Sequence, residues 1–331
     1  MSKLFDNHGR LINYLRLAVT DRCNLRCFYC MPEEGIQYVP QRALLTYEEM
    51  ERLVALLIPM GINKVRITGG EPFVRKDMMA FLTRLSRLEG LEKINLTTNG
   101  TLTAPLVPAL KKIGVTTVNL SLDSLDRDRF YDITRRDVFP QVMETFEQLL
   151  QHDITTKINA VVMANKNIGD LIPMAELTKD HPVSVRFIEE MPFNGEGDKY
   201  GTLLWHHGKI LDHLRQRFPD IEKVPDPPHA TARHYRIPGH RGTIGIIAAF
   251  SRTFCGTCNR IRITPKGTLK TCLYDDGVFN VRDLMRSGAT DAQVRDTFLE
   301  ALGNRAKNGF EAEQRRSFQL PVSESMASIG G

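Results

Sequence analysis

The chain has 331 residues, 42% of them hydrophobic and 25% charged, so it is long enough to bury a core of ordinary size. Its formal net charge of +5 suits a polyanionic small molecule but does not by itself indicate nucleic-acid binding. Apolar runs such as residues 53–60 are too short to span a bilayer, and the first residues form no secretory signal. We therefore expect a cytoplasmic protein without membrane or nucleic-acid partners. In a reducing compartment, its six cysteines are more often metal ligands than disulfides.

The first strand is predicted over residues 11–19, where Arg16 faces away from the apolar positions beside it. It leads directly into three cysteines spaced C-x3-C-x2-C, the first trio: Cys23, Cys27 and Cys30. Three thiolates on one tight loop suit a cubane iron–sulfur cluster whose fourth iron has no protein ligand. A structural zinc ion is the alternative, but it needs a fourth ligand that this loop does not supply.

Strand-like and helix-like segments then alternate along the chain. Thr46 followed by Glu49 predicts a capped helix start. The helices are predicted at about 46–61, 76–88, 106–113, 138–151 and 168–178, and the strands at 64–68, 93–98, 117–122, 156–163 and 183–188. Such alternation over six units predicts a parallel sheet covered by helices.

One face of these strands is polar. Arg66 lies between Val65 and Ile67, and polar residues likewise alternate with apolar ones at 117–123 and 157–160. Helices must cover the apolar outer face, so the polar face would line the lumen. We therefore expect an α/β fold with an incomplete (β/α)6 TIM-like barrel open around a polar ligand. A sheet face exposed to solvent is the alternative.

A proline cluster at 224–228 predicts a domain edge, which divides the chain into a barrel domain, 1–227, and a smaller C-terminal α+β domain, 228–331. The C-terminal part carries the second trio: Cys255, Cys258 and Cys272. A second open iron–sulfur cluster fits this trio. Zinc is a stronger alternative here than at the first trio, because His234 and His240 precede the cysteines and could complete a tetrahedron.

Arg260 and Arg262 are two residues apart on a predicted strand, so both guanidinium groups share one face beside Cys258. Arg16, Arg66 and Lys157 add three cations from the presumed lumen. This density of positive charge is typical of a phosphate-binding site, and paired guanidinium forks suit phosphate oxygens. The ordinary alternative for two such arginines is a solvated basic strand.

The first trio, with Tyr29 before its last cysteine, resembles the signature of the radical S-adenosylmethionine enzymes. Three further segments, 66–72, 97–100 and 254–262, resemble one family within them, the GTP 3′,8-cyclases, lyases of molybdenum cofactor biosynthesis. The resemblance covers almost the whole chain, although Ala18 stands where the family would have serine.

The resemblance implies two [4Fe–4S] clusters, one on each trio, and S-adenosyl-L-methionine as cofactor. It implies that the 5′-deoxyadenosyl radical abstracts the C3′ hydrogen of GTP, and that the product is (8S)-3′,8-cyclo-7,8-dihydroguanosine 5′-triphosphate. It assigns cofactor contacts to Tyr29, Gly70, Ser121 and Met191. It assigns GTP contacts to Arg16, Arg66, Thr97, Lys157, Arg260, Ile261 and Arg262. No protein side chain is assigned as the catalytic residue, because the radical is the reactive species.

The resemblance also implies partners: an external electron donor of the flavodoxin or ferredoxin type, and a downstream cyclic pyranopterin monophosphate synthase. It is compatible with a homodimer. We expect the terminal Gly330 and Gly331 to enter the lumen, although a small-residue tail is often disordered. Two other classes stay open at this point. An iron–sulfur electron carrier would saturate its clusters with protein ligands, and a zinc-dependent nucleic-acid-binding protein would need a broadly basic face.

Overall fold

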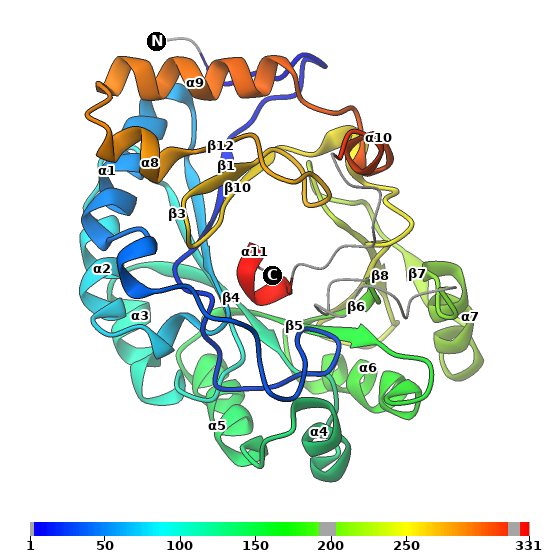
Figure 1. The fold of residues 1–331 in the computed structure, drawn as a ribbon. Helices are drawn as coiled ribbons and strands as arrows, with labels where there is room; N and C mark the ends of the chain where they lie inside the picture. Colours follow the sequence, from blue (N-terminus) through cyan, green and yellow to red (C-terminus); the bar gives the residue numbers. More distant parts are fainter. Residues whose placement is uncertain (1–2, 192–202, 317–324, 331) are drawn as a thin grey trace.

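The computed structural model describes residues 3–191, 203–316 and 325–330. Its centre is a parallel sheet that follows the chain from strand to strand, with helices on the outside (Figure 1). The first six strands are β1 Tyr14–Ala18, β2 Lys64–Thr68, β3 Lys93–Thr98, β4 Val115–Ser121, β5 Thr155–Val162 and β6 Ser184–Glu189. They pair in that order, each parallel to the next. The predicted alternation of six strand–helix units is confirmed.

The helices of this part are α1 Tyr47–Leu57, α2 Met78–Leu85, α3 Val107–Lys112, α4 Arg127–Thr134, α5 Phe139–Gln151 and α6 Leu171–Asp180. Helix α1 begins as predicted, because the Thr46 hydroxyl accepts from the Glu49 N–H while the Glu49 carboxylate accepts from the Thr46 N–H. This reciprocal pair satisfies two backbone donors that the first turn leaves without partners. Helix α4 was not predicted; it and α5 both lie between β4 and β5.

The core lies between the sheet and the helices. Along β2, Val65 and Ile67 are fully buried in it, whereas Lys64 and Arg66 line the cavity on the inner face. Each buried Val, Ile or Leu side chain contributes about 1.5–3 kcal/mol to stability. The apolar side chains therefore fix which face of each strand points outward, and the polar ones are left facing inward. The predicted polar lumen is confirmed.

The C-terminal part extends the same sheet at both edges. Its strands are β7 Glu222–Lys223, β8 Ala232–Arg236, β9 Thr243–Ile247, β10 Arg260–Ile263, β11 Thr268–Lys270 and β12 Phe279–Asn280. Strand β9 pairs parallel to β6, and β10 pairs parallel to β1. The remaining four strands continue the two edges in antiparallel fashion.

The proline cluster at 224–228 lies in the connection between β7 and β8, which pair with each other as a hairpin. The C-terminal helices are α7 His207–Arg217, α8 Val281–Arg286, α9 Asp291–Gly303, α10 Gly309–Gln314 and α11 Met326–Ile329. A separate domain over 228–331 stays a prediction, since its described strands belong to the sheet that the barrel strands form.

Helix α11 lies inside the ring of strands (Figure 1). The other helices lie around the outside of the ring. None of the helices in the described ranges combines the length and the apolar character needed to cross a lipid bilayer. Helix α11 therefore occupies the same interior space toward which the polar faces of the strands point.

Candidate active site

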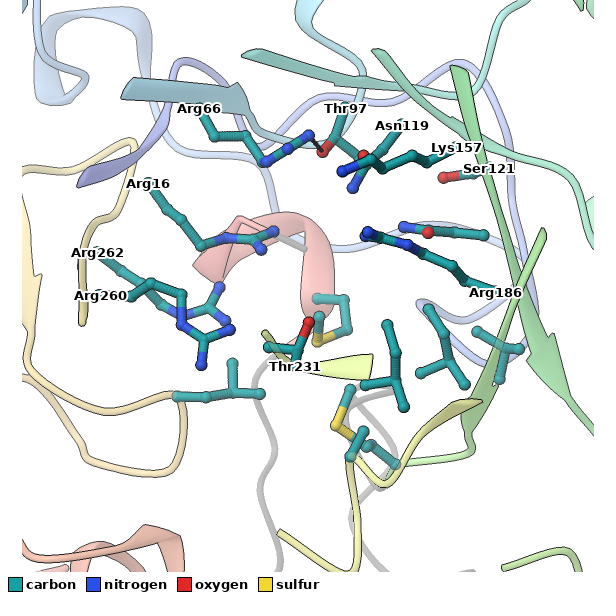
Figure 2. Close-up of a pocket in the computed structure, with 18 of the residues that line it drawn as sticks. Arg16, Arg66, Thr97, Asn119, Ser121, Lys157, Arg186, Thr231, Arg260 and Arg262 are labelled. Atoms are coloured by element: carbon teal, nitrogen blue, oxygen red, sulfur yellow. Dashed lines mark hydrogen bonds between the residues drawn. The ribbon is translucent and has the colours of Figure 1, made fainter. Parts of the chain in front are cut away.

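The lumen holds a cavity of about 470 Å³ that both cysteine trios line. Strand register places the cations of neighbouring strands in one row: Arg16 pairs with Arg66 on one side and with Arg262 on the other. Residues with the same register in parallel strands point to the same face. Lys157 and Arg186 reach the cavity from β5 and β6. Figure 2 shows these side chains converging from several strands, with the ribbon of α11 between them.

Three guanidinium groups of the lumen have lowered pKa values, those of Arg16, Arg262 and Arg186. Burial, followed by the repulsion from Arg262, lowers the pKa of Arg16 well below its usual value. Burial also lowers the pKa of Arg262 and of Arg186 to about 10, with neighbouring arginines adding to the effect. In the described part of the chain, no carboxylate forms an ion pair with Arg262 or Arg186. The lumen is therefore a region of concentrated positive charge.

Lys157 and Tyr14 are two groups of the lumen whose pKa is shifted to about 7. Burial and the nearby Arg186 lower the pKa of Lys157 to about 7. Burial opposes ionisation of Tyr14, but the adjacent Arg66, Arg16 and Lys64 outweigh it and lower its pKa to about 7. The Tyr14 hydroxyl accepts a 2.5 Å hydrogen bond from Arg66 Nε. A polyanion bound here would change both protonation equilibria.

Thr97 and Ile261, two predicted substrate contacts, lie in different surroundings. Thr97 lines the cavity, and its hydroxyl accepts from Arg66 Nη1 at 3.4 Å (Figure 2). Ile261 is fully buried in the core on the outer side of the sheet, because it alternates with Arg260 and Arg262 along β10. Only its backbone could face a ligand in the lumen.

The first trio lies on the loop that follows β1. This loop is held against helix α4, since the Arg26 N–H donates to the Thr134 carbonyl oxygen at 2.9 Å. Its end is a turn in which the Cys27 carbonyl oxygen accepts from the Cys30 N–H. Burial raises the pKa of all three thiols, that of Cys23 to about 12. These thiols stay protonated until a bound metal supplies the positive charge that stabilises thiolates.

The predicted cofactor contacts surround this loop. The hydroxyl of Tyr29 donates to Asp123 at 2.8 Å, and burial raises the pKa of Asp123 to about 6. Ser121 is the last residue of β4, and Met191 follows the end of β6. The four predicted cofactor contacts, Tyr29, Gly70, Ser121 and Met191, line the same cavity as the first trio, and so does Asp123.

The second trio lies between β9 and β12 and lines the same cavity as the first trio. Burial favours the neutral thiol of Cys258, but the guanidinium groups of Arg260 and Arg305 lower its pKa to about 6. Burial raises the pKa of Cys255, and that of Cys272 to about 11. Cys258 is thus the member of this trio that ionises most easily.

The zinc alternative receives no support from His240, whose Nδ1 lies 2.8 Å from the Thr178 hydroxyl of helix α6. His234 Nδ1 is 3.1 Å from the Asp226 carboxylate. Among the described residues, no three His, Cys, Asp or Glu side chains are grouped to hold a single metal ion. Neither trio is therefore arranged here as a closed single-ion site, whereas a cubane cluster takes each thiolate on a separate iron.

Gly330, one of the two terminal glycines expected in the lumen, lies beside the lumen arginines, and Gly331 lies outside the described residues. The Gly330 carbonyl oxygen accepts from Arg262 Nη1 at 2.8 Å and from Arg16 Nη2 at 3.5 Å. Gly330 has φ +78°, and a Cβ there would lie 2.7 Å from the Thr68 hydroxyl and 2.8 Å from Ala18 Cβ. Both the backbone conformation and the narrow space require glycine.

Two family models match the chain: the Radical SAM superfamily over residues 17–178, and Molybdenum Cofactor Synthesis C over residues 183–311. The chain is 40% identical to the GTP 3′,8-cyclase of Desulforamulus reducens over 332 aligned positions, covering 99% of this chain and 100% of that protein. It is also 40% identical to the mitochondrial GTP 3′,8-cyclase of Arabidopsis thaliana, covering 88% of this chain and 75% of that protein. The chain belongs to the GTP 3′,8-cyclase family.

Human molybdenum cofactor biosynthesis protein 1 is 42% identical over 92% of this chain but only 48% of its own length. The chain thus spans about half the length of the animal relatives that it matches. Among solved structures, Streptococcus suis SuiB is similar with a TM-score of 0.59 at 15% identity, covering 83% of this chain and 65% of that one. The structure of SuiB bound to S-adenosylmethionine is similar with a TM-score of 0.58 at 17% identity, covering 87% of this chain and 69% of that one. These two likenesses show the fold.

Several lumen residues were not singled out from the sequence. The most prominent is Arg186, which is largely buried, lines the cavity and reinforces the positive charge around Lys157. Its signal was present in the sequence, because Ser184 and Arg186 alternate with the apolar Val185 and Phe187 along the predicted strand. Lys64, Asn119 and Asn159, which the alternation places on the polar faces of their strands, were expected to face the lumen and line the same cavity.

Gly70 has a structural role that its predicted cofactor contact did not include. A Cβ at this position would lie 2.3 Å from the Arg22 carbonyl oxygen and 3.0 Å from Cys23 Cβ. The adjacent Glu71 N–H donates to the same Arg22 oxygen at 2.9 Å. Glycine therefore lets this segment lie directly against the backbone of the first trio.

Gly70→Ala is expected to displace the loop of the first trio, lower stability by about 1–3 kcal/mol and reduce the iron bound by the first trio. Denaturant unfolding and iron analysis measure the two effects. Gly169→Ala is the matched control, because no atom lies within 4 Å of a Cβ at that position. Equal stability and equal iron content in the two variants would contradict the packing role of Gly70.

Proposed function

We propose that this chain is a radical S-adenosylmethionine lyase that converts GTP to (8S)-3′,8-cyclo-7,8-dihydroguanosine 5′-triphosphate, the first step of molybdenum cofactor biosynthesis. The observation that carries the proposal is one cavity lined by both cysteine trios and by a row of buried cations. Family membership supplies the reaction. The cavity supplies a place where a sulfonium cofactor and a nucleoside triphosphate can lie in contact.

We propose that Cys23, Cys27 and Cys30 hold a [4Fe–4S] cluster. The donor set fits, because three thiols line one side of the cavity and the loop offers no fourth ligand. Such a cluster with S-adenosylmethionine supplies reductive cleavage to methionine and a 5′-deoxyadenosyl radical. Tyr29, Gly70, Ser121 and Met191 are the proposed cofactor contacts. Asp123 fixes the Tyr29 ring through its 2.8 Å hydrogen bond.

The triphosphate of GTP is proposed to lie among the buried cations. Arg16, Arg66 and Arg262 form one row across three adjacent strands, and guanidinium groups bind phosphate oxygens with paired hydrogen bonds. Arg260, Lys157 and Arg186 complete this set, with Thr97 beside Arg66. These cations repel one another in the ligand-free protein, so a polyanion is the class of ligand that would reduce this repulsion most.

Cys255, Cys258 and Cys272 are proposed to hold a second [4Fe–4S] cluster that meets the guanine base. Arg260 and Arg262 adjoin this trio along β10. A GTP molecule whose base lies near the cluster would therefore have its phosphates close to these two cations. This arrangement would orient C3′ and C8 of one GTP molecule toward each other. Fixing such a geometry and excluding water are the main tasks of the protein when the reactive species is a radical.

The chain end is proposed to help set the substrate for hydrogen abstraction. Gly330 already contacts Arg262 and Arg16, two of the proposed phosphate ligands. Its position between α11 and β1 would let the end of the chain limit how deeply the ribose enters. Gly331 would extend this contact.

The remaining proposals concern partners and location. Cleavage of the cofactor needs an electron, which we assign to a flavodoxin- or ferredoxin-like donor in the cytoplasm. The product would pass to a cyclic pyranopterin monophosphate synthase. A homodimer is compatible with the family.

Anaerobic reconstitution followed by product analysis tests the function. With S-adenosylmethionine and dithionite, we expect GTP to give both 5′-deoxyadenosine and the cyclic product. ATP should give little cyclic product and little cofactor cleavage. Iron analysis should give about eight irons per chain, four for each cluster. Zinc in place of iron, or product formation that does not depend on the base, would contradict the proposal.

GTP binding is expected to take up protons near pH 8, because Lys157 and Tyr14 both have pKa values of about 7 in the ligand-free protein. Bound triphosphate would raise both pKa values, so the affinity should fall as the pH rises above about 7. Well below that pH both groups are already protonated, so their contribution to the dependence should disappear. Calorimetry in buffers with different ionisation enthalpies measures the uptake.

Lys157→Arg is the informative variant for this pH dependence, since arginine stays charged through this range. It should bind GTP but take up fewer protons than the wild type, and Tyr14→Phe should remove another part of the uptake. If both variants took up as many protons as the wild type, the assignment of these two groups to the phosphate site would be wrong.

A further inference from the structure

Arg305 lies behind the second trio, with only 3% of its surface exposed. Its Nη2 donates to Cys258 Sγ at 3.2 Å and to the Arg260 carbonyl oxygen at 2.9 Å. Its Nη1 donates to the Cys258 carbonyl oxygen at 3.0 Å. One guanidinium group therefore contacts the sulfur of this cysteine, its backbone and the strand that leads away from it.

The same side chain also reaches the third cysteine of the trio and the N-terminal segment. Arg305 Nε donates to the carbonyl oxygen of Thr271, the residue before Cys272, at 3.0 Å. Arg305 Nη1 forms an ion pair with Asp6 at 3.0 Å. Five contacts thus use the five N–H donors of the guanidinium fork, which fixes its orientation.

The N-terminal segment completes the arrangement at Cys255. Asp6 also accepts from Arg10 Nε at 2.6 Å, and Arg10 Nη1 donates to the Cys255 carbonyl oxygen at 3.0 Å. Asp6, at 6% exposed, therefore holds two arginines that contact the backbone or sulfur of the second trio. The carboxylate orients both guanidinium groups without touching any of the three cysteines itself.

The first trio has hydrogen bonds of a different kind. Cys23 Sγ accepts from the backbone N–H of Leu25 at 3.4 Å and from the side-chain amide of Asn99 at 3.7 Å. Both donors are neutral, whereas Arg305 brings a full positive charge to Cys258. Hydrogen bonds to the ligating sulfurs and local charge are two of the main determinants of the reduction potential of an iron–sulfur cluster.

We propose that Arg305 is a positioning residue of the second trio, which orients Cys258 and makes a cluster held there easier to reduce than it would be without this charge. The proposal rests on the proposed function, because it requires a cluster on the second trio. Among the described residues, Cys258 and the proposed phosphate ligands line the cavity whereas Arg305 does not, so its role is to hold and tune the trio. No contact with GTP is assigned to it.

The test uses the full chain with Cys23, Cys27 and Cys30 replaced by serine, so that only the second trio can bind a cluster. Iron content and a redox titration followed by electron paramagnetic resonance are measured in this reference protein and in Arg305→Gln. We expect Arg305→Gln to shift the midpoint potential to a more negative value and to lower iron content. Arg305→Lys keeps the charge but not the five-donor fork, and should load iron with an intermediate potential.

Two further variants separate this role from general stability. Arg315→Gln is the matched control, since it removes the arginine that follows helix α10 and contacts Glu311 and the Asn304 carbonyl oxygen; its potential should equal that of the reference. Asp6→Asn removes the ion pair but leaves the charge beside Cys258. It should lower the melting temperature without the negative shift in potential.

The outcomes are distinguishable. A reference protein that binds no iron would overturn the second cluster of the proposed function, and with it the role of Arg305. A reference protein with about four irons whose iron content and potential are unchanged in Arg305→Gln would overturn the role of Arg305 alone. If Arg305→Gln binds no iron while Arg315→Gln binds the reference amount, the positioning role is supported, and the potential of Arg305→Lys then tests the effect of charge.

Discussion

Cys27→Ser is expected to abolish formation of 5′-deoxyadenosine from S-adenosylmethionine, with or without GTP. Cys27 is the middle ligand of the first trio, and its thiol is buried beside Asp123 with a strongly raised pKa. Serine cannot supply the thiolate that an iron–sulfur cluster requires. The measurement is 5′-deoxyadenosine released under dithionite by protein reconstituted with iron and sulfide.

Cys258→Ser is the matched control, because it removes one thiol from the other trio. It should keep the first cluster and some uncoupled cofactor cleavage, while GTP affinity and cyclic product are lost. Undiminished 5′-deoxyadenosine from Cys27→Ser would show that the first trio does not hold the cluster that cleaves the cofactor. Unchanged GTP binding in Cys258→Ser would instead contradict the substrate role of the second trio.

Arg262→Ala is expected to have opposite effects on GTP binding and on the stability of the ligand-free protein. The loss of one charge-assisted contact to phosphate costs about 1.5–3 kcal/mol, or a roughly 10- to 150-fold weaker affinity. In the ligand-free protein, however, Arg262 is buried near Arg16 and Arg260, and the burial and repulsion lower its pKa to about 10. Removing it should therefore stabilise the fold or leave its stability unchanged, despite the lost contact with Gly330.

Anaerobic binding of GTP and of guanosine, together with thermal unfolding, measures both effects. Affinity for guanosine should change much less than affinity for GTP, because guanosine has no phosphates. Arg236→Ala, on an exposed residue of β8, serves as the control and should leave GTP binding unchanged. An equal loss for both ligands would contradict a phosphate role for this arginine. A clear drop in the unfolding temperature of Arg262→Ala would contradict the destabilising burial and repulsion argued for the ligand-free protein.

The alternation of strands and helices could be predicted because each element shows its own local periodicity of apolar residues. Val65 and Ile67 alternate with Lys64 and Arg66, and that pattern indicates both the strand and the polarity of each face. The extension of the sheet by C-terminal strands could not be predicted in the same way. Strand β1 pairs with β10 so that Tyr14 lies opposite Arg260, and no local pattern specifies a partner so far along the chain.

Site residues could be predicted where they belong to a sequence motif or to a strand with alternating polarity. Residues outside such patterns could not be predicted. Both trios and five of the cations follow from spacing and alternation, and the structure places them around one cavity. Arg305 lies in the turn after helix α9 and has no sequence pattern that links it to Cys258; only the folded chain brings the two together. Gly70 was expected to make room for a cofactor, whereas the structure shows that it also makes room for the backbone of Arg22.

The measurement that most directly tests the central claim uses GTP carrying deuterium at C3′ of the ribose. The reconstituted protein is incubated with this GTP, S-adenosylmethionine and dithionite, and the 5′-deoxyadenosine is analysed by mass spectrometry. Our account predicts that deuterium moves from C3′ into 5′-deoxyadenosine as the cyclic triphosphate forms. Unlabelled 5′-deoxyadenosine from a protein that cleaves the cofactor and contains both clusters would show that the lumen does not present C3′ of GTP to the radical.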